Sequence, residues 1–137
     1  NAQVVVVPSD KADAAKDIES IKDMTFAVES GSAGEAAAQA AGLNATAVQS
    51  QADALMEVAA GTSDACVIDL LMAGAMIGEG TDYANLVIKD ELNVEEYGVA
   101  FRKGSDVAAA VDTAFDELKA DGTMQTLTDK YGLTLAD

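Results

Sequence analysis

The chain has 137 residues, of which half are hydrophobic and 23% are charged, so it is globular and long enough for one ordinary domain. A net charge of −16, from 24 acidic and 8 basic residues, argues against nucleic acid or anionic lipid as a partner. With no histidine and a single cysteine, His-dependent nucleophilic catalysis, an internal disulfide and the usual transition-metal sites are excluded, and we expect no catalytic residue, metal or cofactor.

The first predicted element is a strand over residues 3–7. This run is continuously apolar and β-branched apart from its first residue, and Pro8 stops it, which fits a strand buried on both faces. The next stretch, 11–22, is charged with scattered alanine and isoleucine. We expect a surface connection with a short helix there.

Residues 25–35 predict a strand, a turn and the start of a helix. Gly31 and Gly34 allow a sharp turn and close approach of the backbone, while Ser32 and Glu35 have the spacing of a capping box. The N–H groups at a helix N-terminus are unpaired and the helix dipole favours an anion, so a carboxylate or phosphate could bind in this turn. The alternative is that Ser32 only caps a helix, and the residues alone leave both interpretations open.

The remaining elements alternate between helices and strands. They are predicted as a helix at 33–41, a strand at 46–49, a helix at 52–60, a strand at 65–68, a helix at 69–77, strands at 86–89 and 96–102, and helices at 106–120 and 123–131. This alternation predicts an α/β fold with a mainly parallel sheet.

Four stretches of the sequence carry a resemblance to a known family. They are the segment FAVESGSAGE at 26–35, the spaced Asp-Ala and Gly residues over 53–69, the segment EEYGVAFRKGSD at 95–106, and the closing segment 111–132. In order and spacing, the four resemble type II periplasmic binding proteins of the extracellular solute-binding family 3, which feed amino-acid ABC transporters.

The resemblance implies two α/β lobes, each with helices flanking a sheet, joined by two hinge strands. The implied division is a first hinge strand at 1–8, the second, ligand-binding lobe at 9–94, a return hinge strand at 95–102, and C-terminal helices of the first lobe at 103–137. In the family the rest of the first lobe precedes the first hinge strand. We therefore expect this chain to be a fragment that holds half of a ligand cleft.

The resemblance also implies a binding site for the α-carboxylate of an amino acid. It lies in the turn from Gly31 to Gly34, where hydroxyl and amide groups donate hydrogen bonds. Ser32 keeps a hydroxyl, whereas Ala33 stands where many relatives have threonine and offers only its amide. A lost hydrogen bond to a charged group would cost roughly 1.5–3 kcal/mol unless water replaces it.

Two acidic residues complete the implied site. Asp69 matches the acid that pairs with the ligand's α-ammonium group, and it follows a strand, at the edge of an α/β sheet where ligands bind. Capping of the next helix is the ordinary alternative for Asp69, and the two roles can coexist. Glu29 matches a position that lines the pocket for the ligand side chain, where a carboxylate would favour a basic or polar amino acid, although an exposed Glu29 that contacts nothing is the alternative.

The implied function is the solute-binding component of an ABC transporter, which binds a free amino acid and delivers it to a membrane permease. The implied location is periplasmic or extracellular, with a lipoprotein anchor as an option. Two alternatives remain open: a cyclohexadienyl dehydratase-like enzyme on the same fold, and a non-binding, receiver-like α/β signalling module.

The C-terminal helices also suggest self-association. Val107, Val111, Phe115 and Leu118 share one side of a helix whose partner lobe we expect to be missing. We further expect the strand at 3–7 to have an open edge, which invites pairing with another chain. We therefore expect a homodimer, with exchange of the segment after residue 103 between two copies.

Overall fold

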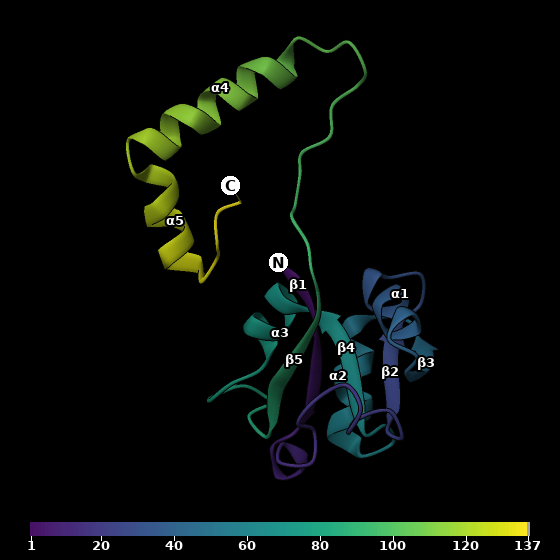
Figure 1. Cartoon of the computed structure of the whole chain (residues 1–137). Helices are drawn as coiled ribbons and strands as arrows, with labels where there is room; N and C mark the ends of the chain where they lie inside the picture. Colours follow the sequence, from purple (N-terminus) through teal and green to yellow (C-terminus); the bar gives the residue numbers. More distant parts are fainter. Residues whose placement is uncertain (137) are drawn as a thin grey trace. The chain divides into compact units, whose positions relative to one another are not determined.

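The computed structural model describes residues 1–136 of the chain. These form two compact units, Asn1–Glu95 and the part from Glu96 onward, which are described separately (Figure 1). None of the helices in this described part is long and apolar enough to cross a membrane.

The first unit is built on a five-stranded sheet in the order β3-β2-β4-β1-β5 (Figure 1). The strands are β1 (Ala2–Pro8), β2 (Thr25–Glu29), β3 (Asn44–Val48), β4 (Ala65–Asp69) and β5 (Leu86–Val94). β2 pairs in parallel with β3 and β4, whereas β1 is antiparallel to both of its neighbours, β4 and β5. The α/β class is confirmed, but the sheet is mixed. The apolar run over β1 indicates a strand that is buried on both faces. A central strand is buried in this way whether it runs parallel or antiparallel to its neighbours, so the run does not predict the direction of the strand.

Each face of the sheet carries its own apolar core. Val4 and Val6 of β1 lie on one face and pack with buried residues of α2 (Gln51–Ala60) and α3 (Leu70–Met76). Val5 and Val7 lie on the other face and pack with α1 (Ala33–Ala40) and with the segment that follows β1. All four valines are fully buried. The alternation follows from the two-residue period of a strand, and it gives the unit three layers.

The connection between β1 and β2 differs from its prediction. Only a short 3-10 helix, η1 (Ser9–Lys11), forms, and turns rather than the expected helix follow. Ala15 and Ile21 of this connection are buried against the sheet, with exposed fractions of 4% and 1%. The charged composition predicted a surface segment, but the side chains of Ala15 and Ile21 pack into the core and hold the connection against the sheet.

β5 is longer than predicted, and the strand expected at 96–102 is wrong. β5 continues through Asp90, Glu91 and Asn93, and residues 95–102 have no regular secondary structure. β1 holds this polar half in the sheet by pairing with β5 along its whole length, through two register irregularities. Pairing overrides composition here, as is common for strands. The expected open edge of β1 is also wrong, because β3 and β5 are the edge strands.

The second unit contains two helices, α4 (Val107–Ala120) and α5 (Thr123–Tyr131), which contact each other. Gly122 between them adopts the left-handed conformation at φ 83°. Neither helix boundary departs from its prediction by more than one residue. The large apolar side chains that remain exposed in this unit include Val107, Phe115, Leu118, Leu127, Tyr131 and Leu133.

Candidate functional site

One edge of the sheet gathers the predicted site residues. The parallel strands β2 and β4 end there, at Glu29 and Asp69. β1 begins at the same edge because it is antiparallel, and Gln3 lies opposite Asp69 in the strand register. β5 ends there as well, with Asn93 opposite Gln3. Ligands of α/β sheets usually bind at the carboxyl ends of parallel strands.

Ser32 caps α1 as predicted, but the Glu35 side chain reaches back to the residue before the cap and not to the Ser32 N–H group, so the capping box is incomplete. The Ser32 hydroxyl accepts a hydrogen bond of 3.0 Å from the Glu35 N–H group, and the Glu35 carboxylate accepts one of 2.7 Å from the Gly31 N–H group. Gly31 has φ 74°, so the turn needs glycine at this position. Within residues 1–136, no acceptor receives the N–H groups of Ala33 and Gly34. The helix therefore presents two backbone donors at this edge.

Gly34 serves close packing rather than the turn. It is buried, and a Cβ atom there would lie 2.9 Å from the Val67 carbonyl oxygen and 3.1 Å from the Gln3 Oε1 atom. A side chain would therefore push α1 away from β4. Glycine at this position brings the helix N-terminus against the strand edge that carries Asp69.

Asp69 caps α3 and also bonds to Asn1, the residue before β1. Its Oδ1 atom accepts hydrogen bonds from the N–H groups of Leu71 at 2.9 Å and Met72 at 3.3 Å. Its Oδ2 atom accepts a bond of 2.7 Å from Asn1 Nδ2. The Asp69 N–H group donates to Gln51 Oε1 at 2.9 Å. The capping role is confirmed, and the half-buried carboxylate is held rigidly at the sheet edge.

A polar network that sequence reasoning missed surrounds Asp69. Asn1 Nδ2 also donates to Glu95 Oε1 at 2.6 Å, and Gln3 Nε2 donates to the same oxygen at 2.7 Å. Gln3 is only 4% exposed. One signal could have identified Gln3: it is an amide in a strand predicted to be buried on both faces, and buried amides need partners. Nothing local marked Asn1 or Glu95.

Of the comparisons with known proteins, only the comparison with solved structures finds proteins similar to this chain. No family model matches the chain, and no curated protein does. The ancestral amino-acid-binding protein AncCDT-1, a precursor of cyclohexadienyl dehydratase, is 30% identical with a TM-score of 0.76, over 94% of this chain and 56% of its own. An amino acid ABC transporter substrate-binding protein from Streptococcus pneumoniae, solved with L-arginine, is 25% identical with a TM-score of 0.71, over 99% of this chain and 59% of its own.

A shorter match decides the family. Domain 2 of an arginine-binding protein, TmArgBP, is 30% identical with a TM-score of 0.54, and the match covers 92% of that domain and 64% of this chain. The chain belongs to the substrate-binding proteins of amino-acid ABC transporters. The predicted family and its type II fold are confirmed. This substrate-binding protein spans little more than half the length of the intact relatives it matches.

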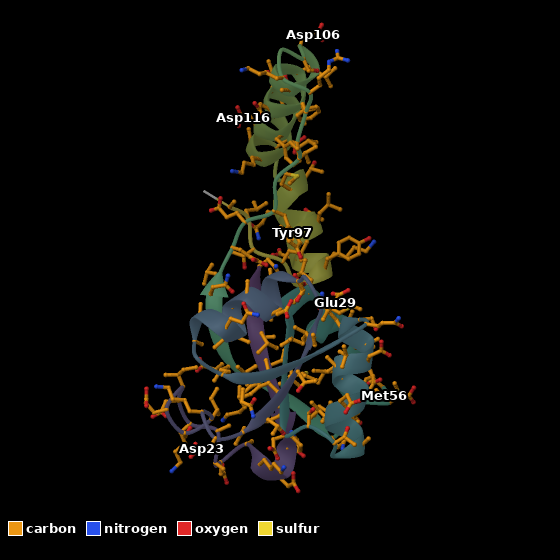
Figure 2. The ribbon with its side chains drawn as sticks, turned by 90° about the vertical axis from the view of Figure 1, so that its right-hand side faces the viewer. Asp23, Glu29, Met56, Tyr97, Asp106 and Asp116 are labelled. Carbon is orange, nitrogen blue, oxygen red and sulfur yellow. The ribbon has the colours of Figure 1, made fainter. Side chains whose placement is uncertain are left out.

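Three other residues of the stretches that resemble the family, Glu29, Asp53 and Asp64, differ from one another in their surroundings. Glu29 is half-buried at the end of β2, and its side chain makes no hydrogen bond or ion pair within residues 1–136. Figure 2 shows it at the end of the first unit opposite Asp23. Asp53 accepts a hydrogen bond from Ser50, which caps α2, and Asp64 pairs with Lys11 at the other end of β4 from Asp69.

The site contains no other reactive group in the described part of the chain. Cys66 is fully buried in β4, and this burial raises the pKa of its thiol to about 12, so the thiol is inert and serves the core. No cluster of acidic or cysteine side chains within residues 1–136 could hold a metal ion. The arrangement offers backbone N–H donors and a carboxylate, which is chemistry for binding a charged small molecule.

Proposed function

We propose that this chain supplies half of the cleft of a substrate-binding protein that captures a free amino acid for an ABC transporter. One observation carries the proposal: unpaired N–H donors of Ala33 and Gly34 and the carboxylate of Asp69 lie at the same sheet edge. An amino acid has an anionic and a cationic group on one carbon atom. An anion site beside a cation site suits that zwitterion.

In this proposal the ligand's α-carboxylate binds at the N-terminus of α1. The amides of Ala33 and Gly34 and the hydroxyl of Ser32 donate to it, and the helix dipole adds a favourable field. Gly31 shapes the turn. The α-ammonium group binds the Asp69 carboxylate, and Glu29 lines the pocket for the side chain. Relatives solved with arginine make a basic amino acid the first ligand to test.

We also propose the division that the family implies, with the strand β1 at one crossing and an irregular segment at the other: hinge segments at 1–8 and 95–102, the ligand-binding lobe at 9–94, and first-lobe helices at 103–137. The lobe that these helices would join supplies the rest of the cleft. The complete protein would act outside the cytoplasm, in the periplasm or beyond it, with or without a lipid anchor. There it would deliver the amino acid to a membrane permease.

Substitutions at Asp69 test the ligand site. Asp69→Ala should weaken binding by about two orders of magnitude or more, because it leaves the ligand ammonium unpaired in a desolvated cleft. Asp69→Asn should weaken binding similarly but keep the helix cap, since Asn caps as well as Asp. Ser32→Ala should cost less affinity, because the amide donors remain. Calorimetric titration of the complete protein with all twenty amino acids measures these effects.

The Asp69→Asn variant separates the two roles of this residue. Asp69→Ala should lower the free energy of unfolding by about 1 kcal/mol through the lost cap, while Asp69→Asn should change it by much less. If both variants bind the ligand as tightly as the unchanged protein, Asp69 is only a cap and the proposed site is incorrect.

A dehydratase-type enzyme is the second candidate, because one relative is described as a precursor of cyclohexadienyl dehydratase. That relative is itself described as amino-acid-binding, so binding remains the first proposal. Turnover of a cyclohexadienyl substrate by the complete protein distinguishes the two. The receiver-like signalling alternative is withdrawn, because the chain belongs to a substrate-binding family and its central strand β1 is antiparallel.

A further inference from the structure

The side chain of Asn1 lies between two carboxylates. Its Nδ2 atom is 2.7 Å from Asp69 Oδ2 and 2.6 Å from Glu95 Oε1. An amide nitrogen carries two hydrogen atoms, so each carboxylate receives one. Hydrogen bonds from a neutral donor to an ionised acceptor are short and strong. The amide thus connects two residues that are far apart in the sequence.

The orientation of this amide follows from its surroundings. If the amide were turned over, its oxygen would face two negatively charged groups. In the observed orientation Asn1 Oδ1 is buried and has no hydrogen-bond partner within residues 1–136. Buried polar atoms without partners are rare and need an explanation. Here the two charge-assisted bonds on the nitrogen fix the amide and leave its oxygen without a donor.

Glu95 is fastened at the same place by two further contacts. Gln3 Nε2 donates to Glu95 Oε1 at 2.7 Å, and the Glu95 N–H group donates to the Asn1 carbonyl oxygen at 2.9 Å. Glu95 is the last residue of the first unit, and the residues immediately after it have no regular secondary structure. The network therefore ends where the chain leaves the sheet.

We propose that Asn1 is a positioning residue that holds the Asp69 carboxylate beside Glu95 and so couples the ammonium-binding acid to the point where the chain leaves the sheet. The ligand part of this inference rests on the proposed function. Without the amide, two like charges face each other and repel. With it, both carboxylates accept a hydrogen bond from the same nitrogen. Because coupling between sites is reciprocal, a ligand that binds Asp69 then also acts on the attachment of Glu95.

The first test needs no ligand and compares Glu95→Gln in two backgrounds, the unchanged chain and Asn1→Ala. The urea midpoint of unfolding is measured for each. Exposed Glu91→Gln, on the edge strand β5 that ends just before Glu95, is the control for removing one negative charge from an acidic chain. Relative to that control, Glu95→Gln should lower the midpoint when Asn1 is present and raise it in Asn1→Ala. Equal shifts in the two backgrounds overturn the proposal.

The second test measures affinity in the complete protein by calorimetry with L-arginine and the other nineteen amino acids. Asn1→Ala should weaken binding of whichever amino acid binds by roughly tenfold or more, and Asn1→Gln, which keeps an amide, should recover part of the loss. Unchanged affinity in Asn1→Ala refutes the coupling to the ligand. If no amino acid binds the unchanged protein, the proposed function fails, and the urea comparison alone decides whether Asn1 positions Asp69.

Discussion

Gly34 and Gly74 both lie in helices of the first unit, but only Gly34 meets a neighbour. A Cβ atom at Gly34 would lie 2.9 Å from a backbone oxygen of Val67, whereas one at Gly74 in α3 would meet nothing within 4 Å. A backbone atom cannot move aside as the end of a flexible side chain can. The contact of α1 with the sheet edge therefore depends on the absence of a single methyl group.

We predict that Gly34→Ala lowers the free energy of unfolding by about 1–3 kcal/mol, the usual cost of overpacking, even though alanine favours helices. Gly74→Ala is the matched control and should be neutral or stabilising by up to about 1 kcal/mol, since it gains helix propensity without a clash. Urea unfolding of both variants measures this difference. Equal effects at the two positions would mean that α1 shifts without cost.

At the scale of elements, the connection between β1 and β2 is tied to the sheet away from the candidate site. The Lys11 ammonium is 2.7 Å from Asp64 Oδ1, and the N–H and hydroxyl groups of Thr25 donate to Asp64 Oδ2 at 3.0 and 2.9 Å. The hydrogen bond from Lys11, followed by those from Thr25, lowers the pKa of Asp64 from 3.8 to about 2. The ionised form of Asp64 therefore stabilises the folded chain.

This ion pair predicts a specific acid sensitivity. The pKa of Asp64 is lower in the folded than in the unfolded chain, so its contribution is complete above pH 4 and disappears as the pH falls from 3.8 to about 2. The side chains are 44% and 39% exposed, so the contribution should not exceed about 1 kcal/mol. Asp64→Asn should flatten the pH dependence of unfolding in that interval. Asp13→Asn, at an exposed position, is the control and should leave the dependence intact.

Sequence patterns predicted the elements whose stabilising contacts join residues that are close together in the sequence. The helix caps at Ser32 and Asp69 were visible because their partners lie within a few residues. The polar half of β5 was not visible, because its place in the sheet depends on pairing with β1. The same reason hid Asn1 and Glu95, which are 94 positions apart and become neighbours only through that pairing. Side-chain periodicity cannot report such contacts.

At the scale of the whole molecule, the second unit exposes apolar side chains that an isolated soluble chain rarely leaves bare. Phe115 and Leu118 of α4 are 41% and 38% exposed, and Leu127 and Tyr131 of α5 are 43% and 63% exposed. Grouped apolar surface of this kind usually marks an interface. The edge of β1 no longer supports association, so the expectation of a homodimer rests on these helices alone.

We predict that the isolated 137-residue chain forms a homodimer at micromolar concentration, with exchange of the segment after residue 103 as its form. Sedimentation equilibrium measures this. Phe115→Glu should shift the equilibrium toward monomer, and Met56→Glu, an exposed position on α2, should not. Added salt should strengthen the dimer, because the net charge of −16 on each copy opposes association. A monomer at high micromolar concentration with ordered α4 and α5 contradicts the prediction.

The direction of β1 determines how the first unit can be used in protein engineering. Because β1 starts and β5 ends at one edge, the two ends of the first unit lie together: the Glu95 N–H group donates to the Asn1 carbonyl oxygen at 2.9 Å. Such a unit can be spliced into a host chain at one point, or closed by a short linker and reopened in an exposed turn such as the one at Gly42. The first unit is in this sense a transferable module whose two ends lie beside the proposed ligand site. Domain 2 of a relative has already been crystallised by itself.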